Sequence, residues 1–351
     1  MVSMVKQLIP YIVAAILVTF LISALIPLSK KIGLVDKPDQ RKQHYGAVPL
    51  VGGIAMVVSL ALSILLFQTS FHDFRLLFFC IGVLTIIGAL DDQRELKPTM
   101  KVFAQLLVAL LMTIIGGTVV LNVGDIFAIN RSIGLAIFAI PLTVISIVGV
   151  INAFNMIDGH DGLAAVVTIL GLLGLSVLLY FRATTDDHQY VVIIFLLITL
   201  LTVFLVFNLG LLKASNRIFL GDAGSMFLGL IMVFLLIQLS QREVPVVSTT
   251  AAAWIIGVPL LDMFSVITTR ILSRVSLLQA DRNHIHHLLE QQGLGKGQVL
   301  ALLAMLQLVF VSIGVFGTLL EWPDAALFWG AFFAFTLYFL LLVVSGKRFG
   351  R

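Results

Sequence analysis

The sequence predicts an all-α polytopic integral membrane protein with about 11 transmembrane helices, on the grounds of its composition and its long apolar runs. Of the 351 residues, 60% are hydrophobic and only 11% are charged, and the mean hydropathy is +1.11. Soluble domains carry roughly 25% charged residues, so no soluble fold could cover this much apolar surface. The single cysteine, Cys80, excludes an intramolecular disulfide. Nothing in the formal charge of +4 points to a nucleic-acid partner, and we expect none.

The apolar runs follow one another along the whole chain, each close to the roughly 20 residues that a spanning helix needs. They cover residues 8–28, 50–68, 76–90, 100–121, 135–152, 163–181, 190–209, 224–240, 246–268, 298–319 and 325–345. The third run is short and ends at Asp91-Asp92, so it can cross only if those carboxylates face a water-filled cavity. No soluble domain and no internal repeat is evident, which counts modestly against an inverted-repeat transporter.

The distribution of basic residues predicts the orientation. With the N-terminus outside, 17 of the 22 Lys and Arg residues fall in inward loops and five fall outside. Because positive loops stay in the cytoplasm, we expect an N-out, C-in topology. All three acidic clusters of the chain then lie on the cytoplasmic side, at the ends of apolar runs, where carboxylates are costly without a function.

The first acidic cluster is Asp91-Asp92. Neighbouring residues point about 100° apart on a helix, so both can face one direction only if the helix has ended. Two close carboxylates repel, and Mg²⁺ relieves such repulsion while taking other ligands from substrate phosphates. The alternative is a solvated helix end.

The second cluster is NAFNMIDGHDGL, in which Asn152, Asn155, Asp158 and Asp161 recur every three residues. Because Gly159 and Gly162 let the chain leave a helix, we expect a helix end and a tight loop that gathers these hard oxygen ligands. The alternative is an Asx-rich turn that caps two helices.

The third cluster is IFLGDAGS, where Gly221 provides backbone freedom, Asp222 lies near an N-cap and Gly224 permits close approach. Phe219 is either a base-stacking aromatic or an interfacial anchor. Asp262, in the ninth run, is either a functional carboxylate or a partner in helix packing.

Further along, DRNHIHHLL places Arg282, His284, His286 and His287 together. Phosphate binding fits this group better than zinc, because HExxH is absent and cysteine is scarce. The basic residues before the second run, Lys42 and His44 among them, fit either a substrate or lipid head groups. Lys101 either meets a phosphate or extends to the membrane surface.

Five segments in this order resemble the polyprenyl-phosphate N-acetylhexosamine-1-phosphate transferases. They are RKQHYGAVPLVGG, ALDDQRELKPTMK, NAFNMIDGHDGLA, RIFLGDAGS and DRNHIHHLL, and the resemblance runs from about Lys30 to Gln292. The HIHH form after Asp-Arg is similar to the WecA/TagO branch, which uses UDP-GlcNAc. The resemblance implies an MraY/WecA-like fold and one transmembrane transferase domain over residues 1–351. Its active site would be formed by the cytoplasmic loops at about 29–49, 91–99, 153–162, 210–223 and 269–297.

The resemblance also implies roles for matching residues. Catalytic roles fall on Asp91, Asp92, Asp158 and Asp161. Ligands of Mg²⁺, with Mn²⁺ as an alternative ion, are Asp222, Asn155 and Asp92. Substrate contacts are Asn152, Gly159, Phe219, Arg282, His284, His286, His287, Lys101, Lys42 and His44. One departure is Asn208, which lies fourteen residues before Asp222, whereas the family asparagine lies about ten before, so its role is left open.

The implied function is transfer of GlcNAc-1-phosphate from UDP-GlcNAc to undecaprenyl phosphate, with release of UMP, at the bacterial inner membrane. This reaction is the first lipid-linked step of a cell-envelope polysaccharide such as O-antigen, enterobacterial common antigen or a wall polymer. One alternative is another donor such as UDP-MurNAc-pentapeptide. Another is a cation-coupled transporter, which predicts carboxylates near the bilayer midplane. A homodimer is left open.

Overall fold

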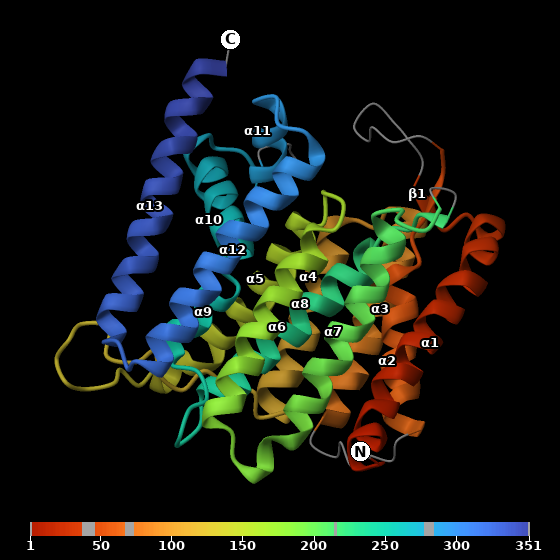
Figure 1. The fold of residues 1–351 in the computed structure, drawn as a ribbon. Coiled ribbons are helices and arrows are strands. Elements are labelled where there is room, and N and C mark those ends of the chain that lie inside the picture. Colours follow the sequence, from red (N-terminus) through yellow and green to blue (C-terminus); the bar gives the residue numbers. More distant parts are fainter. Residues whose placement is uncertain (1, 37–45, 67–73, 214–215, 277–283, 350–351) are drawn as a thin grey trace.

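The computed structural model describes residues 2–36, 46–66, 74–213, 216–276 and 284–349, and this part of the chain is almost entirely helical (Figure 1). Its only strands are β1 (Val35–Asp36) and β2 (Val48–Pro49), which pair antiparallel. The first helices are α1 (Val2–Ile32), α2 (Gly52–Leu66), α3 (Arg75–Arg94), α4 (Pro98–Leu110) with the π-helical turn η2 (Leu111–Ile115), and α5 (Ala139–Ile157) after η3 (Ala136–Phe138). Then follow α6 (Leu163–Arg182), η4 (Thr185–Asp187), α7 (His188–Asn208) and α8 (Gly221–Ser240). The last are α9 (Thr249–Ile255), α10 (Gly257–Leu272), α11 (Ile285–Gln291), α12 (Lys296–Leu319) and α13 (Asp324–Phe349).

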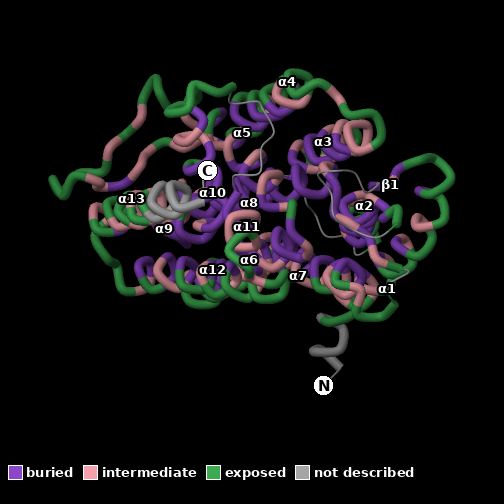
Figure 2. The backbone as a smooth tube through the Cα atoms, turned by 90° about the horizontal axis from the view of Figure 1, so that it is seen from above, coloured by how far each residue is buried: buried purple, intermediate pink, exposed green. Residues whose placement is uncertain are grey.

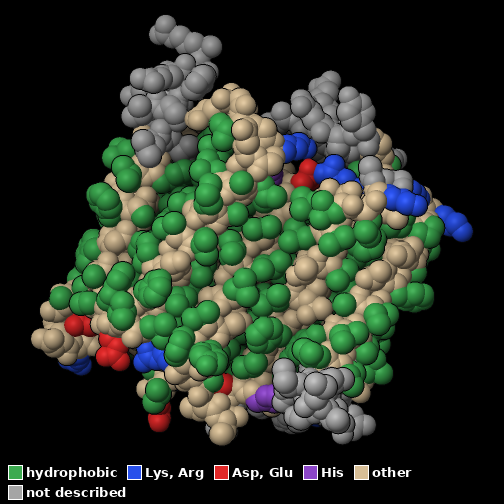
Figure 3. Space-filling view, in the orientation of Figure 1, with side chains coloured by type: hydrophobic (Ala, Val, Ile, Leu, Met, Phe, Trp, Pro, Cys, Tyr) green, Lys and Arg blue, Asp and Glu red, His purple; other side chains and the backbone are tan. Residues whose placement is uncertain are grey.

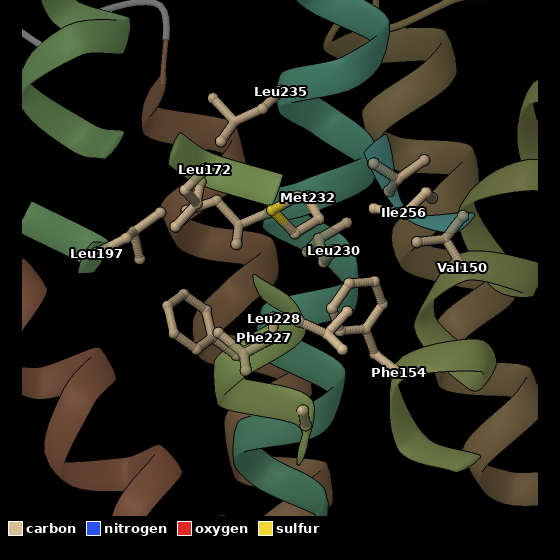
Figure 4. Packing of buried hydrophobic residues seen from close by; sticks show 14 of the residues in the cluster. Val150, Phe154, Leu172, Leu197, Phe227, Leu228, Leu230, Met232, Leu235 and Ile256 are labelled. Atoms are coloured by element: carbon tan, nitrogen blue, oxygen red, sulfur yellow. The ribbon is translucent and has the colours of Figure 1, made fainter. Parts of the chain in front are cut away.

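Helix α8 lies at the centre of the bundle. In its most apolar 18-residue stretch 94% of the residues are buried, against 17% in α1 at the edge, and Figure 2 shows the other helices arranged around it. Phe227, Leu228 and Met232 of α8 lie among side chains such as Phe154 of α5 and Leu172 of α6 (Figure 4). The helix that carries Asp222 in its first turn is therefore held from several sides.

Glycines let neighbouring helices approach the backbone of α8 closely. A Cβ added at Gly53 of α2 would overlap Gly224, and one added at Gly88 of α3 would overlap Ala223. Lipid is as apolar as a leucine side chain, so close backbone packing rather than hydrophobic burial drives helix association in a membrane. The expected close approach at Gly224 is confirmed, and it fixes α2, α3 and the first turn of α8 against one another.

Each apolar run of the sequence contains one or two helices of the structure. Within the described residues, eight helices are long and apolar enough to span a membrane, or nine if the bent pair α9–α10 is one span. Two shorter apolar helices, Gly52–Leu66 and Asp324–Leu340, cover the remaining runs. The chain is thus a multi-pass membrane protein, whereas eleven spans and the N-out, C-in orientation stay predictions.

The run at 246–268 is not one continuous helix as expected. It breaks at Ile256, and α9 and α10 meet at 85°. A break inside a membrane leaves backbone groups that lipid cannot satisfy. Here the buried side chain of Gln307 on α12 accepts from the Val258 amide at 3.0 Å and donates to the Ile255 carbonyl at 2.7 Å. The sequence of the run alone gives no sign of this remote partner.

Charged side chains gather at two ends of the bundle and leave an apolar belt between them (Figure 3). One end, which we call the site end, holds residues 29–36, 46–53, 91–98, 157–163, 208–213, 216–222 and 284–296. Residues 116–138, 182–190, 240–250 and 319–325 form the opposite end. Helices α3 and α5 end, and α4 and α8 begin, at the site end (Figure 1).

Candidate active site

Asp91 and Asp92 lie in the last turn of α3, which continues to Arg94. They therefore lie at the end of α3 but still within the helix, and the two carboxylates diverge as helical neighbours do. Asp91 accepts hydrogen bonds from the Leu96 amide and from Lys101 Nζ, both at 2.7 Å. Asp92 instead accepts from the Asp222 amide at 3.0 Å. Each carboxylate thus ties α3 to a different neighbouring helix.

Lys101 joins two of the acidic clusters. Its ammonium lies 2.7 Å from Asp91 Oδ2 and 2.8 Å from Asp222 Oδ2. Asn155, near the end of α5, donates from Nδ2 to Asp222 Oδ1 and to Ser225 Oγ, both at 2.9 Å. Four helices, α3, α4, α5 and α8, therefore meet at the Asp222 carboxylate.

Asp92 caps the first turn of α8 from outside that helix. The residue before α8, Leu220, has no capping side chain, and the Asp92 carboxylate takes that place. Gly221 has φ +75°, and a Cβ there would come within 2.5 Å of Asp92 Oδ2. That oxygen is buried and has no hydrogen-bond partner. A buried, unsatisfied carboxylate oxygen is costly, so it marks a place prepared for a cation or a proton.

Asp158 ends α5, as the sequence predicted from the glycines that follow it. Burial, and then the negative charges of Asp222, Asp92 and Asp161, raise the pKa of Asp158 well above its ordinary value. This side chain therefore belongs to the same negative field as Asp92 and Asp222.

Asp161 has cationic partners of its own. It pairs with Arg217 and lies 3.4 Å from Lys296 Nζ. It therefore joins the loop after α5 to the segment before α8 and to the start of α12. Asp161 thus lies at the rim of the site, and its carboxylate is paired with basic side chains.

Arg217 was not singled out from the sequence, although it directly precedes the third cluster. Its guanidinium lies 5.4 Å from the centre of the half-buried Phe219 ring, and its Nε donates to the Asn208 carbonyl at 3.0 Å. Asn208 donates from Nδ2 to the Ile218 carbonyl at 2.9 Å. Asn208 thus holds the end of α7 against the segment that leads to α8.

The histidines of α11 occupy three different environments. His284 Nδ1 lies 2.8 Å from Asp262 Oδ2, and His287 keeps 30% of its side chain exposed. His286 is 1% exposed, and neither of its ring nitrogens has a hydrogen-bond partner. Burial, and then the charges of His287, His284 and His160, lower the pKa of His286 to about 2, so this ring is neutral at physiological pH.

Helix α11 lies directly against the loop after α5. A Cβ added at Gly159 would come within 2.8 Å of His286 Nε2. His160, which the sequence analysis did not select, bridges Glu290 Oε1 at 3.2 Å and the Lys296 carbonyl at 3.0 Å. Only its place inside the second acidic cluster could have drawn attention to it.

The Asn152 side chain hydrogen-bonds away from the acidic side chains of the site. Its Nδ2 donates to Gln105 Oε1 at 2.7 Å and to the Val148 carbonyl at 2.8 Å, deeper between α4 and α5. Lys42, His44 and Arg282 lie outside the described residues.

The resemblance implies a bound metal. In the part of the chain that the structure describes, no group of three His, Cys, Asp or Glu side chains could hold a metal by itself. Mg²⁺ needs only one or two carboxylates and completes its shell with water and substrate phosphate. The unsatisfied Asp92 Oδ2 and the Asp222 carboxylate fit that requirement.

Comparison of the sequence with known proteins identifies one family. A profile described as Glycosyl transferase family 4 matches residues 74–240, which run from α3 to α8. A relative from Haemophilus influenzae is 34% identical over 330 residues, covering 92% of each chain. Relatives from Yersinia pestis and Escherichia coli strain K12 are each 32% identical and cover 88% of this chain and 84% of their own. All three are named undecaprenyl-phosphate alpha-N-acetylglucosaminyl 1-phosphate transferase. At this identity and coverage, with the matched segment containing Asp91, Lys101, Asn155 and Asp222, the chain belongs to glycosyl transferase family 4.

Proposed function

We propose that this protein transfers GlcNAc-1-phosphate from UDP-GlcNAc to undecaprenyl phosphate, forming undecaprenyl-diphospho-GlcNAc and UMP. The reaction takes place at the site end, which faces the cytoplasm of a bacterium in the N-out, C-in orientation. The whole chain acts as one transferase domain. Support comes from the relatives' shared name and from the excess of basic residues on the loops of that end.

The observation that carries the proposal is the sharing of Lys101 between Asp91 and Asp222. The Lys101 ammonium lies beside Asp91 and Asp222, while Asp92 bonds to the Asp222 amide and Asp158 is subject to the charges of Asp222 and Asp92. A donor diphosphate and a lipid phosphate are themselves anions, and they cannot enter such a field without additional positive charge. A phosphoryl-transfer site needs cations in this way, and a site for a neutral solute does not.

Mg²⁺ is the cation that the donor set favours. Asp222 and Asp92 would hold it, and Asn155 would contribute through Oδ1, since its Nδ2 is already engaged. When bound there, the ion would supply positive charge to offset that of the diphosphate. Lys101 stays beside Asp222 and orients that carboxylate.

The chain's own residues would then govern attack and proton transfer. An oxygen of the lipid phosphate attacks the β-phosphorus of the donor, and the bond from that phosphorus to the oxygen of UMP breaks. If the acceptor oxygen carries a proton, Asp91 receives it, because its side chain is 11% exposed while Asp92 Oδ2 is buried. Asp158 adds to the field that keeps the cation in place.

The donor would lie between α11 and the segment before α8. His287 is the histidine with the most exposed side chain of the three that were singled out, and it contacts the diphosphate. Phe219 stacks on uracil once Arg217 moves from its ring face to a donor phosphate. His284 and His286 support this surface from beneath.

Radiolabelled UDP-GlcNAc incubated with the purified protein and undecaprenyl phosphate tests the reaction. We expect label in the chloroform phase that depends on lipid phosphate and on a divalent cation, with UMP formed in equal amount. A tenfold excess of unlabelled UDP-GlcNAc suppresses the signal, whereas UDP-MurNAc-pentapeptide at the same excess leaves it. Suppression by both compounds would mean that the enzyme accepts more than one donor. Uptake of label into vesicles without label in the lipid would mean that the protein is a transporter and not a transferase.

A further inference from the structure

We infer that Asp262 is a positioning residue that docks the histidine-bearing helix α11 onto α10. Its carboxylate lies on α10 and is fully buried. Oδ2 lies 2.8 Å from His284 Nδ1, and Oδ1 accepts from the Ile285 amide at 2.8 Å. This inference rests on the proposed donor role of α11 and names the residue that sets its place.

Both oxygens of Asp262 act on the first turn of α11. The Ile285 amide is one of the donors that a helix start leaves without an internal partner. His284, the residue before the helix, offers no side-chain cap. A helix of seven residues is too short to be stable by itself, so this carboxylate both begins the helix and ties it to the bundle.

The same carboxylate fixes the His284 ring. A carboxylate at Nδ1 selects the tautomer and the ring direction of a histidine. The His284 and His286 rings lie parallel, 5.8 Å apart with 7° between their planes. The orientation of the His284 ring therefore constrains that of the His286 ring, which packs against Gly159.

The bend between α9 and α10 makes this contact possible. It redirects α10 by 85°, and Gln307 satisfies the backbone groups that the bend leaves open. Asp262 lies within the second turn of the redirected helix. A carboxylate outside the Asp91–Lys101–Asp222 group thus sets the donor half of the site, and it does so without meeting substrate.

Kinetics of Asp262→Asn, His284→Gln and the double variant test the inference. Asparagine keeps an acceptor for the Ile285 amide but turns an NH₂ group towards His284 Nδ1. Loss of a group that orients a functional side chain costs roughly 10- to 100-fold. We expect the KM for UDP-GlcNAc to rise at least tenfold in each single variant, with the KM for undecaprenyl phosphate within twofold of wild type. Because both changes break one pair, the double variant should be no worse than the poorer single variant.

Ser265→Ala is the matched control, since Ser265 is equally buried on α10 and bonds only the Leu261 carbonyl within its own helix. It should keep wild-type kinetics. Wild-type and Ser265→Ala turnover test the proposed function itself, so inactivity of both would refute that function, whereas the variant-to-wild-type ratios concern only Asp262.

A thiol probe gives a second measurement that needs no turnover. The native Cys80 is buried, so a cysteine placed at the buried Ile285 reports on α11 alone. We expect maleimide to label Ile285→Cys slowly, and at least tenfold faster once Asp262→Asn is added. Additive kinetic effects, an equal rise in both KM values, an unchanged donor KM in His284→Gln or an unchanged labelling rate would each overturn the inference.

Discussion

The two ends of the helix bundle differ in whether certain buried polar side chains have a partner. At the site end, Asp92 Oδ2 and both ring nitrogens of His286 are buried without a hydrogen-bond partner. At the opposite end, Arg242 pairs with Asp187 and lies 4.7 Å from the centre of the Tyr190 ring. The site end thus holds buried polar atoms that have no partner, whereas the Asp187 and Arg242 side chains at the opposite end satisfy each other.

The opposite end also has a cavity, of about 530 Å³, lined by groups such as Arg182 and Asp324. Arg182 donates to the Thr318 carbonyl at 2.8 Å, and Asp324 accepts from Thr250 Oγ1 at 2.6 Å and from the Asp125 amide at 3.0 Å. Arg182 and Asp324 are thus engaged in holding loops together. A cavity alone is a poor guide to function, and unsatisfied buried groups are a better one.

Asp222→Asn gives the largest expected effect and tests the site end directly. The change turns an amide group towards Lys101 or Asn155, both of which donate to Asp222, and removes a proposed metal ligand. We expect the rate of lipid labelling to fall at least ~100-fold, the scale for loss of one electrostatic contact at a reacting centre. The rate is measured at saturating Mg²⁺ and normalised to protein inserted in the membrane.

Asp324→Asn, at the opposite end, is the matched control and should stay within twofold of wild type. If Asp222→Asn retains wild-type turnover at saturating Mg²⁺, Asp222 is not a metal ligand. Equal losses in both variants would remove the distinction between the two ends.

His287→Ala gives an intermediate effect and tests the donor surface. The side chain is partly exposed beside Glu290, and loss of one charge-assisted hydrogen bond corresponds to roughly tenfold in affinity. We expect the KM for UDP-GlcNAc to rise about tenfold while the KM for the lipid stays unchanged. His188→Ala, an exposed histidine at the start of α7 on the opposite end, should change neither value. Wild-type kinetics in His287→Ala would remove this residue from the donor surface.

The helices were predictable from the sequence because each apolar run carries its own signal of length and composition. Each run contains one or two helices, and the family was identified from short segments whose residue types and order are specific. The break between α9 and α10 was not predictable, because Gln307, about fifty residues away, satisfies the open backbone groups.

The candidate site shows the same limit. Residue types and helix ends indicated that Asp91, Asn155 and Asp222 matter, and the structure places them around Lys101. Sequence could not indicate which carboxylate meets which cation. Asp161 with Arg217 and Asp262 with His284 are pairs between segments far apart along the chain, and such partners become known only when the helices are placed in space.

Asp187→Asn gives the smallest expected effect and concerns stability alone. Asp187 is 1% exposed and Arg242 25% exposed, so the pair is only partly buried, and removing one partner costs about 1–3 kcal/mol. For a chain of this size that lowers the thermal midpoint by a few degrees. We expect kcat and both KM values to stay at wild type, because the pair lies at the opposite end from the site.

The pH dependence of that loss identifies the charge pair as its cause. Burial alone would raise the pKa of Asp187, but hydrogen bonds from Arg242 and Thr184 and the Arg242 charge lower it below the ordinary value. The folded-state pKa therefore lies below the unfolded value of about 3.9, so the pair's contribution is complete above that pH and is lost as the pH falls through the folded pKa. The difference in thermal midpoint between wild type and Asp187→Asn should stay constant from about pH 8 to pH 5 and shrink below about pH 4. A difference that persists undiminished in acid would mean that side-chain shape, not charge, holds η4 against α8.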